Sequence, residues 1–404
     1  MARGSRGGRG GMIRGRGGFM PKPKGPMVPK LPFNRLPFDL LLCDRAFPRV
    51  TPLPDEEPFT QALTKRANDL TPPAEELAAV TTLVSKVQEV LEKIKTTPPA
   101  ALETVCQIED LKQVGSLKKG TILKGHRTGD IVVVLKTLPL STCIELLGNN
   151  VVEMLRTQEP QLLVSLTVTP NKGFEIHTRD AVVRVLIATV SRNLLKLDPK
   201  LHLERKVLLC HMAAIGHCRW FEENGQHATV KTLIRLLRDL KNKFQGLEPL
   251  HPWVLDLLAH YAIMNNPNRQ ALPINVAFRR ALQLLSAGLL LQGSPGIVDP
   301  CETNGFKAIN VMNSLTFEHQ DSICLTAQTL VRLFDHAGFE NILDAKYDLT
   351  ARNNSLEQYC CQPFGKGVRE TCSQRRENGS RAISRTGSNG NSINVCVVRL
   401  FLRQ

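Results

Sequence analysis

The chain has 404 residues, of which 42% are hydrophobic and 22% charged, a globular composition with room for about two domains. Its formal net charge of +15 is unevenly placed: residues 1–38 hold nine Lys or Arg and no acid, residues 346–404 hold ten against four, and residues 39–345 hold 33 of each. The neutral body excludes a histone-like packing protein, whose folded surface would itself be basic.

Residues 1–38 are predicted to be a disordered arm. Residues 1–18 contain five Arg and eight Gly, so they have almost no apolar surface to offset the entropy lost on ordering. Flexible guanidinium groups contact phosphates and stack on bases, which makes five arginines candidate nucleic-acid contacts: Arg3, Arg6, Arg9, Arg14 and Arg16. A solubilising tail or an import signal is the alternative. The arm has no apolar core of the kind that a secretory signal peptide requires, so we expect an intracellular protein.

Residues 39–195 are predicted to form a mixed α/β lobe. A helix is expected from Thr71 to Ile94 because apolar residues recur there at steps of three and four and Pro72 suits the first helical position. A short strand around Gln113–Gly115 and a helix near Glu145–Arg156 are also expected. The β-branched run Ile131–Leu135 and the apolar run Ala181–Thr189 indicate buried strands.

Residues 196–345 are predicted to form an all-helical lobe. One helix has an apolar stripe from Val230 to Phe244, flanked by a basic face: Lys231, Arg235, Arg238 and Lys241. That face is either solvated charge or a nucleic-acid contact. Further helices are expected at Trp253–Met264, Val276–Leu291 and Asp321–Phe334. The longest apolar stretch, Ala281–Leu291, is too short to span a bilayer, so no membrane association is predicted.

Residues 346–404 are basic and polar and are predicted to be a mostly disordered tail. The eleven cysteines of the chain are an odd number without a Cys-x-x-Cys pair, which favours reduced intracellular thiols. The pairs Cys210-His211 and His217-Cys218 can share a helical face. Zinc ligands usually show tighter pairing, so no metal site is predicted.

The segment with recognisable chemistry runs from Val114 to Val133. A strand that ends in Gly115-Ser116 lets backbone amides and a hydroxyl approach a triphosphate, because glycine has no side chain to block them. An acid-apolar-acid triplet on the following strand would place two carboxylates on one face, where they can hold paired metal ions. Here the triplet reads Asp130-Ile131-Val132.

This segment resembles the template-independent nucleotidyltransferases and is most similar to their oligoadenylate-synthetase branch, which also carries a Lys-Gly-Thr between the Gly-Ser and the acids. The chain departs from that pattern because valine stands at the second acid, and the later strand offers only Arg184 as a charged residue. One carboxylate cannot assemble a two-metal site, so no catalytic residue is predicted and no cofactor is required. Two interpretations stay open. The segment is a structural relic, or it binds a nucleoside triphosphate with Mg²⁺ without turnover through Gly115, Ser116, Lys119 and Asp130.

Three further segments make the chain resemble the DZF ("domain associated with zinc fingers") family: Arg219–Asn224, Pro252–Pro267 and Asp299–Glu302. The resemblance covers about residues 36–343. It implies a nucleotidyltransferase-like fold without activity, used to pair with a larger DZF-domain subunit that carries double-stranded-RNA-binding or zinc-finger modules. It further implies pairing through residues 250–340 and a role with RNA and DNA in transcription, RNA processing and translation, in the nucleus and also in the nucleolus and cytoplasm.

The chain departs from the family after Ala345, where members usually continue the domain and end in an acidic tail. An alternative exon or a shifted reading frame would explain the difference. Three functional hypotheses follow: a heterodimerising pseudoenzyme, which we favour, a working template-independent nucleotidyltransferase, and a stand-alone RNA-binding protein.

Overall fold

The computed structural model describes residues 38–43, 56–169, 172–268, 270–304, 307–336 and 338–344. The tail predicted at 346–404 and the five arginines proposed to contact nucleic acid lie outside these residues. The α+β class predicted from the sequence is confirmed: a mixed α/β lobe is followed by a largely helical one.

A five-stranded sheet forms the centre of the α/β lobe. Its strands lie in the order β1 (Ile108–Val114), β2 (Thr128–Leu135), β5 (Val182–Thr189), β4 (Gly173–His177) and β3 (Ser165–Thr169). Only β2 and β5 pair in parallel, and this register places Asp130 opposite Arg184. β2 is a β-branched run buried on two faces, which is why a continuous apolar pattern predicted it, whereas β5 is interrupted by the exposed Arg184.

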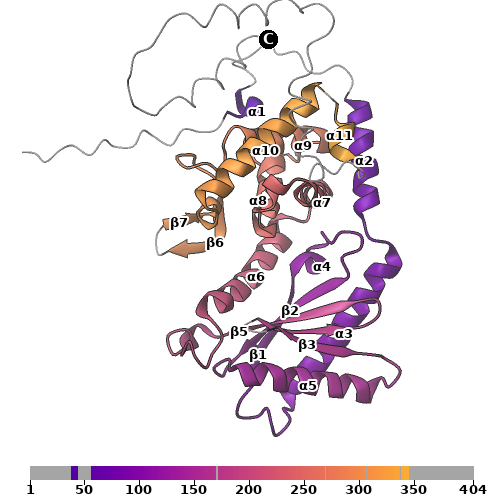
Figure 1. Ribbon diagram of the computed structural model, residues 1–404, viewed down its shortest axis with the longest axis vertical. Coiled ribbons are helices and arrows are strands. Elements are labelled where there is room, and N and C mark those ends of the chain that lie inside the picture. Colours follow the sequence, from indigo (N-terminus) through magenta and orange to yellow (C-terminus); the bar gives the residue numbers. More distant parts are fainter. Residues whose placement is uncertain are drawn as a thin grey trace, which may run out of the picture. The chain divides into compact units, whose positions relative to one another are not determined.

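Helices cover both faces of the sheet (Figure 1). On one face, α3 (Ala74–Thr96) and α5 (Ser141–Gln158) pack against Ile131, Val133 and Leu135. On the other face, α6 (Arg205–Asn224) covers Val132 and Val134. The period of two along β2 therefore puts Asp130 on the face that α6 covers.

The second lobe contains five helices among the described residues: α7 (Ala228–Lys243), α8 (Pro252–Met264), α9 (Ile274–Ser286), α10 (Phe317–His336) and α11 (Glu340–Leu343). The prediction that this lobe is all helical was wrong, because β6 (Val298–Asn304) and β7 (Lys307–Asn310) form an antiparallel hairpin. Short 3₁₀ turns occur at Ser191–Asn193, Gln245–Leu247 and Val311–Ser314.

Two helices that precede the sheet in sequence pack on this second lobe. Asp39, next to α1 (Leu40–Cys43), forms a buried ion pair with Arg280 of α9 at 2.8 Å. In α2 (Glu57–Leu70), the ring of Phe59 lies 6.0 Å from that of Phe278, and Arg66 pairs with Asp239 of α7 at 2.7 Å. The structure thus differs from the predicted lobe of residues 39–195, because α1 and α2 contribute to the other lobe.

The predicted elements were otherwise close to the observed ones. The first long helix starts at Ala74, after Pro73, rather than at Thr71. The strand expected at Gln113–Gly115 is longer toward its start and ends at Val114, because Gly115 opens the short helix α4 (Gly115–Lys119). No helix in the described parts of the chain is both long and apolar enough to cross a membrane.

Candidate functional site

The turn between β1 and α4 brings the backbone of Gly115 against the side chain of Asp130. The antiparallel register places Val114 opposite Asp130, and Gly115 has a φ of 80°. A Cβ atom at Gly115 would lie 2.1 Å from Oδ2 of Asp130, so a larger residue cannot be accommodated without moving the carboxylate. Two of the four predicted cradle residues, Gly115 and Asp130, are therefore in contact.

Asp130 is engaged by an arginine. Nε of Arg184, its partner in the parallel register, donates a hydrogen bond of 2.6 Å to Oδ1 of Asp130, and Asp130 is only 7% exposed. The guanidinium thus neutralises the one acid that remains of the triplet. Arg184, the only charged residue of the later strand, thus places its guanidinium against the carboxylate that a metal ion would need as a ligand.

Val132 occupies the second acid position and is fully buried. It packs in an apolar cluster with Val114, Val134, Ala188 and Cys218, beneath α6. A carboxylate placed there would have no water and no cation, and its burial would be costly. The residues present therefore do not fit a pair of metal ions.

Lys119, the third predicted cradle residue, points into the protein. Its Nζ donates a hydrogen bond of 2.7 Å to Oδ2 of Asp256 in α8, and the side chains of Lys119 and Asp256 are 8% and 0% exposed. The ammonium also lies 5.2 Å from the ring centroid of Trp253. The structure thus gives Lys119 a buried partner 137 residues away in sequence. Ser116 is half-buried beside it, and its carbonyl accepts a hydrogen bond from the Thr121 amide. The nucleotide cradle stays a prediction.

The residues of the basic face of α7 are half-buried and hydrogen-bonded within the protein. Nη2 of Arg235 donates to the carbonyl of Gly120 at 2.8 Å, and Nη1 of Arg238 donates to the carbonyl of Thr121 at 3.3 Å. Lys241 donates to the carbonyl of Leu250, and Lys231 to the side chain of Gln226. Arg235, Arg238 and Lys241 thus satisfy carbonyl groups that follow α4 and precede α8, whereas the choice between solvated charge and a nucleic-acid contact stays a prediction. The sequence showed the charges but not the carbonyls that they reach.

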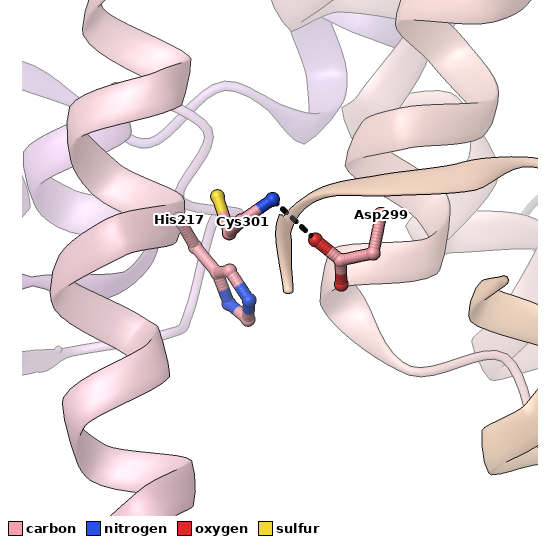
Figure 2. A group of neighbouring side chains, drawn as sticks. All are labelled: His217, Asp299 and Cys301. Atoms are coloured by element: carbon pink, nitrogen blue, oxygen red, sulfur yellow. Dashed lines mark hydrogen bonds between the residues drawn. The ribbon is translucent and has the colours of Figure 1, made fainter. Parts of the chain in front are cut away.

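The cysteines and histidines of α6 do not form a single cluster of side chains. Cys210 is exposed, whereas Nδ1 of His211 lies 2.7 Å from the carbonyl of Ile187 and Cys218 is buried. His217 lies instead beside Asp299 and Cys301 of β6 (Figure 2). Burial, followed by the charge of Lys119, lowers the pKa of His217 to about 4, so its imidazole is neutral at pH 7.

His211 links the stability of the fold to pH. Burial is the main cause of its lowered pKa, so between pH 6.5 and that lower value the unfolded chain binds a proton that the folded chain does not. Stability is therefore expected to fall as the pH drops below 6.5, and the urea midpoint measured at several pH values would show the loss. His211→Asn, which can still donate to the carbonyl of Ile187, should make the fall smaller. His126→Asn, at an exposed histidine, should leave it unchanged. Equal pH profiles for His211→Asn and the wild type would contradict the assignment.

The chain matches the models of two protein-family domains. The model of the DZF N-terminal domain matches residues 17–226, and that of the DZF C-terminal domain matches residues 229–359.

Three solved structures are also similar to the chain. A complex of CdnC with HORMA-deltaN from E. coli MS115-1 is 16% identical, with a TM-score of 0.47, and the match covers 74% of this chain and 95% of that one. The Cid1 poly(U) polymerase bound to Mg and 3'-dATP is 11% identical, with a TM-score of 0.47, over 72% and 99% of the two chains. A cytoplasmic RNA terminal U-transferase is 9% identical, with a TM-score of 0.49, over 71% and 98%. The two domain matches cover most of the sequence, and the chain belongs to the DZF family.

Proposed function

We propose that this chain is a catalytically inactive, nucleotidyltransferase-like subunit that heterodimerises with a larger DZF-domain protein. The observation that carries the proposal is the state of the acid triplet: Asp130 is ion-paired with Arg184, and Val132 is buried under α6. A site with these residues cannot place two metal ions, and two ions are what organises phosphoryl transfer in enzymes of this kind. On this proposal, the folded part of the chain serves to bind a partner through its surface rather than to catalyse a reaction.

Exposed apolar side chains on the second lobe support a pairing role. Phe317 and Leu325, both on α10, are 64% and 65% exposed, and Val298 of β6 is 52% exposed. Apolar groups that stay in water on a folded lobe are candidates for burial against a partner. All three lie in the stretch 250–340, where the resemblance to the DZF family implies pairing.

Light scattering of the purified chain mixed with a partner DZF domain tests this. We expect a stable 1:1 species, and Leu325→Asp should weaken it at least about tenfold, because a charge would be buried at the contact. Leu163→Asp is the matched control, since Leu163 is 86% exposed and lies in the other lobe. Separate monomers at micromolar concentration would contradict pairing, and equal effects of the two substitutions would place the interface elsewhere.

The Arg/Gly arm is proposed to add affinity for RNA and DNA to that of the partner's modules. Residues 1–38 carry nine positive charges, so the slope of log affinity against log salt can reach at most about −6 on single strands. Deleting residues 1–38 should remove most of the affinity of the isolated chain at low salt in a filter-binding assay. Unchanged binding would show that the arm is not a nucleic-acid contact.

We further propose that the heterodimer acts in the nucleus, and also in the nucleolus and cytoplasm, in transcription, RNA processing and translation. This part rests on membership of the DZF family and on the basic arm. The larger subunit would supply the double-stranded-RNA-binding or zinc-finger modules.

A further inference from the structure

A second group of chemically capable side chains lies where α6 meets the β6–β7 hairpin. His217 of α6 and Asp299 and Cys301 of β6 each offer one ligand atom, and these atoms lie within 4.8 Å of one another (Figure 2). Asp299 is 6% exposed, whereas His217 and Cys301 are half-buried. An imidazole, a carboxylate and a thiol thus converge from elements that are more than 70 residues apart in sequence.

Neighbouring groups orient these ligands. Oδ1 of Asp299 accepts a hydrogen bond of 2.8 Å from the backbone amide of Cys301, and Oδ2 accepts one of 2.7 Å from Nε1 of Trp253. The ring of His217 stacks on that of Trp253, with centroids 4.0 Å apart and planes inclined by 11°. Outer contacts of this kind fix the direction of metal ligands in known sites. Trp253 thus holds two of the three side chains in place.

One ring nitrogen of His217 has no other role among the described residues. Nε2 of His217 is buried and has no hydrogen-bond partner within the part of the chain that the structure describes. A buried polar atom normally has a partner, and its absence calls for an explanation such as an ion. The two carboxylate oxygens of Asp299 keep lone pairs beyond the hydrogen bonds that they accept.

We propose that His217, Asp299 and Cys301 bind one zinc ion, with a water molecule as the fourth ligand. Nitrogen, thiolate sulfur and carboxylate oxygen together favour Zn²⁺ over Mg²⁺ or Ca²⁺, which prefer oxygen alone. With bonds of about 2.0–2.3 Å, tetrahedral ligands lie roughly 3.3–3.7 Å apart, so the present group has to close by about 1 Å. Binding replaces the proton of the Cys301 thiol by zinc and releases that proton to solvent, without a change of oxidation state.

The nearby positive charge of Lys119 does not prevent this. Its ammonium is bound to Oδ2 of Asp256 at 2.7 Å, and that ion pair balances its charge locally. Burial, followed by the charge of Asp299, raises the pKa of the Cys301 thiol to about 11, and Lys119 opposes this rise only in part, so zinc has to displace the thiol proton when it binds. A zinc ion would connect α6 to β6, so it would stabilise the hairpin against the helix.

Cobalt substitution tests the site in the full-length chain after treatment with a chelator. Co²⁺ alone should bind with one equivalent per chain and give a thiolate-to-cobalt charge-transfer band, which Zn²⁺ should abolish by displacement. Cys301→Ser should remove the band and lower Zn²⁺ affinity by about 100-fold or more, and His217→Gln should lower affinity comparably. Cys210→Ser is the matched control, because it changes an exposed cysteine of α6, the helix that carries His217. It should leave the band and the affinity unchanged.

The unfolding temperature gives a second readout that does not depend on the cobalt spectrum. Zn²⁺ should raise it for the wild type and for Cys210→Ser but not for Cys301→Ser or His217→Gln, and circular dichroism establishes that each variant is folded. A cobalt–thiolate band that persists in Cys301→Ser, or no band in the wild type, would overturn the proposal.

Discussion

Replacing Lys119 by alanine is expected to lower the free energy of unfolding by about 3–5 kcal/mol, because it leaves a buried carboxylate without its ion-pair partner. Asp256 is 0% exposed, and Lys119 is the residue that donates to it, at 2.7 Å. Arg238 lies 3.9 Å from the other oxygen but already donates to the carbonyl of Thr121, so it compensates only in part. Urea denaturation of the full chain at pH 7 measures the change.

The neighbouring lysine is the matched control. Lys118 pairs with Glu222 at 3.0 Å, but the two side chains are 42% and 46% exposed, so Lys118→Ala should cost less than about 1 kcal/mol. The double change Lys119→Met with Asp256→Leu removes both charges and should recover much of the loss. A cost below about 1 kcal/mol for Lys119→Ala would contradict the prediction, because Asp256 would then depend little on this partner.

Restoring the missing acid is expected to damage the fold without creating an enzyme. Val132→Asp places a carboxylate in the apolar cluster beneath α6, and we expect a loss of about 3–5 kcal/mol, since even a partly neutralised acid is poorly solvated there. Asp130 would remain tied to Arg184, so the new acid has no free companion for a metal pair. The measurements are urea denaturation and incorporation of labelled ATP or UTP onto RNA with Mg²⁺ or Mn²⁺.

A smaller polar change at the same position separates charge from shape. Val132→Thr has nearly the same volume and should cost about 1–3 kcal/mol, less than Val132→Asp. Neither variant nor the wild type should incorporate nucleotide. Incorporation by the wild type that is abolished by Asp130→Asn would contradict the pseudoenzyme proposal and restore the transferase hypothesis.

The elements that sequence predicted well are those whose burial follows a simple period. The long helix α3 and the strands β2 and β5 show it, because one face or both faces of each are buried among the same neighbours along their whole length. The hairpin β6–β7 was missed because its strands, Val298–Asn304 and Lys307–Asn310, are short and mostly polar and carry no alternation. The packing of α2 against the second lobe was missed because the sequence around α2 does not indicate which distant residues it contacts, such as Asp239 and Phe278.

The features of the candidate site also fall into those that the sequence predicted and those that it did not. The shared face of Asp130 and Val132 follows from strand alternation, and the nearness of Arg184 follows from two adjacent strands. The destinations of Lys119 and of the α7 arginines depend on helices packed in three dimensions, so composition and spacing could not supply them. The sequence shows that a residue is basic, but only the fold shows whether its charge pairs with a group inside the protein.

The ion pair between Asp39 and Arg280 has a consequence for synthesis on the ribosome. The two residues are 241 positions apart in sequence. At translation rates of about 5–20 residues per second, Arg280 is therefore synthesised roughly 12–50 s after Asp39. During that interval the apolar side of α2, with Phe59, Leu63 and Ala67, has no lobe to pack on, because its contacts on α7 and α9 have not yet been made. The nascent chain therefore displays an unburied amphipathic helix, a segment suited to a chaperone, until α7 and α9 have been made, and Phe59 gains its last ring contacts only with Phe334 and Phe339.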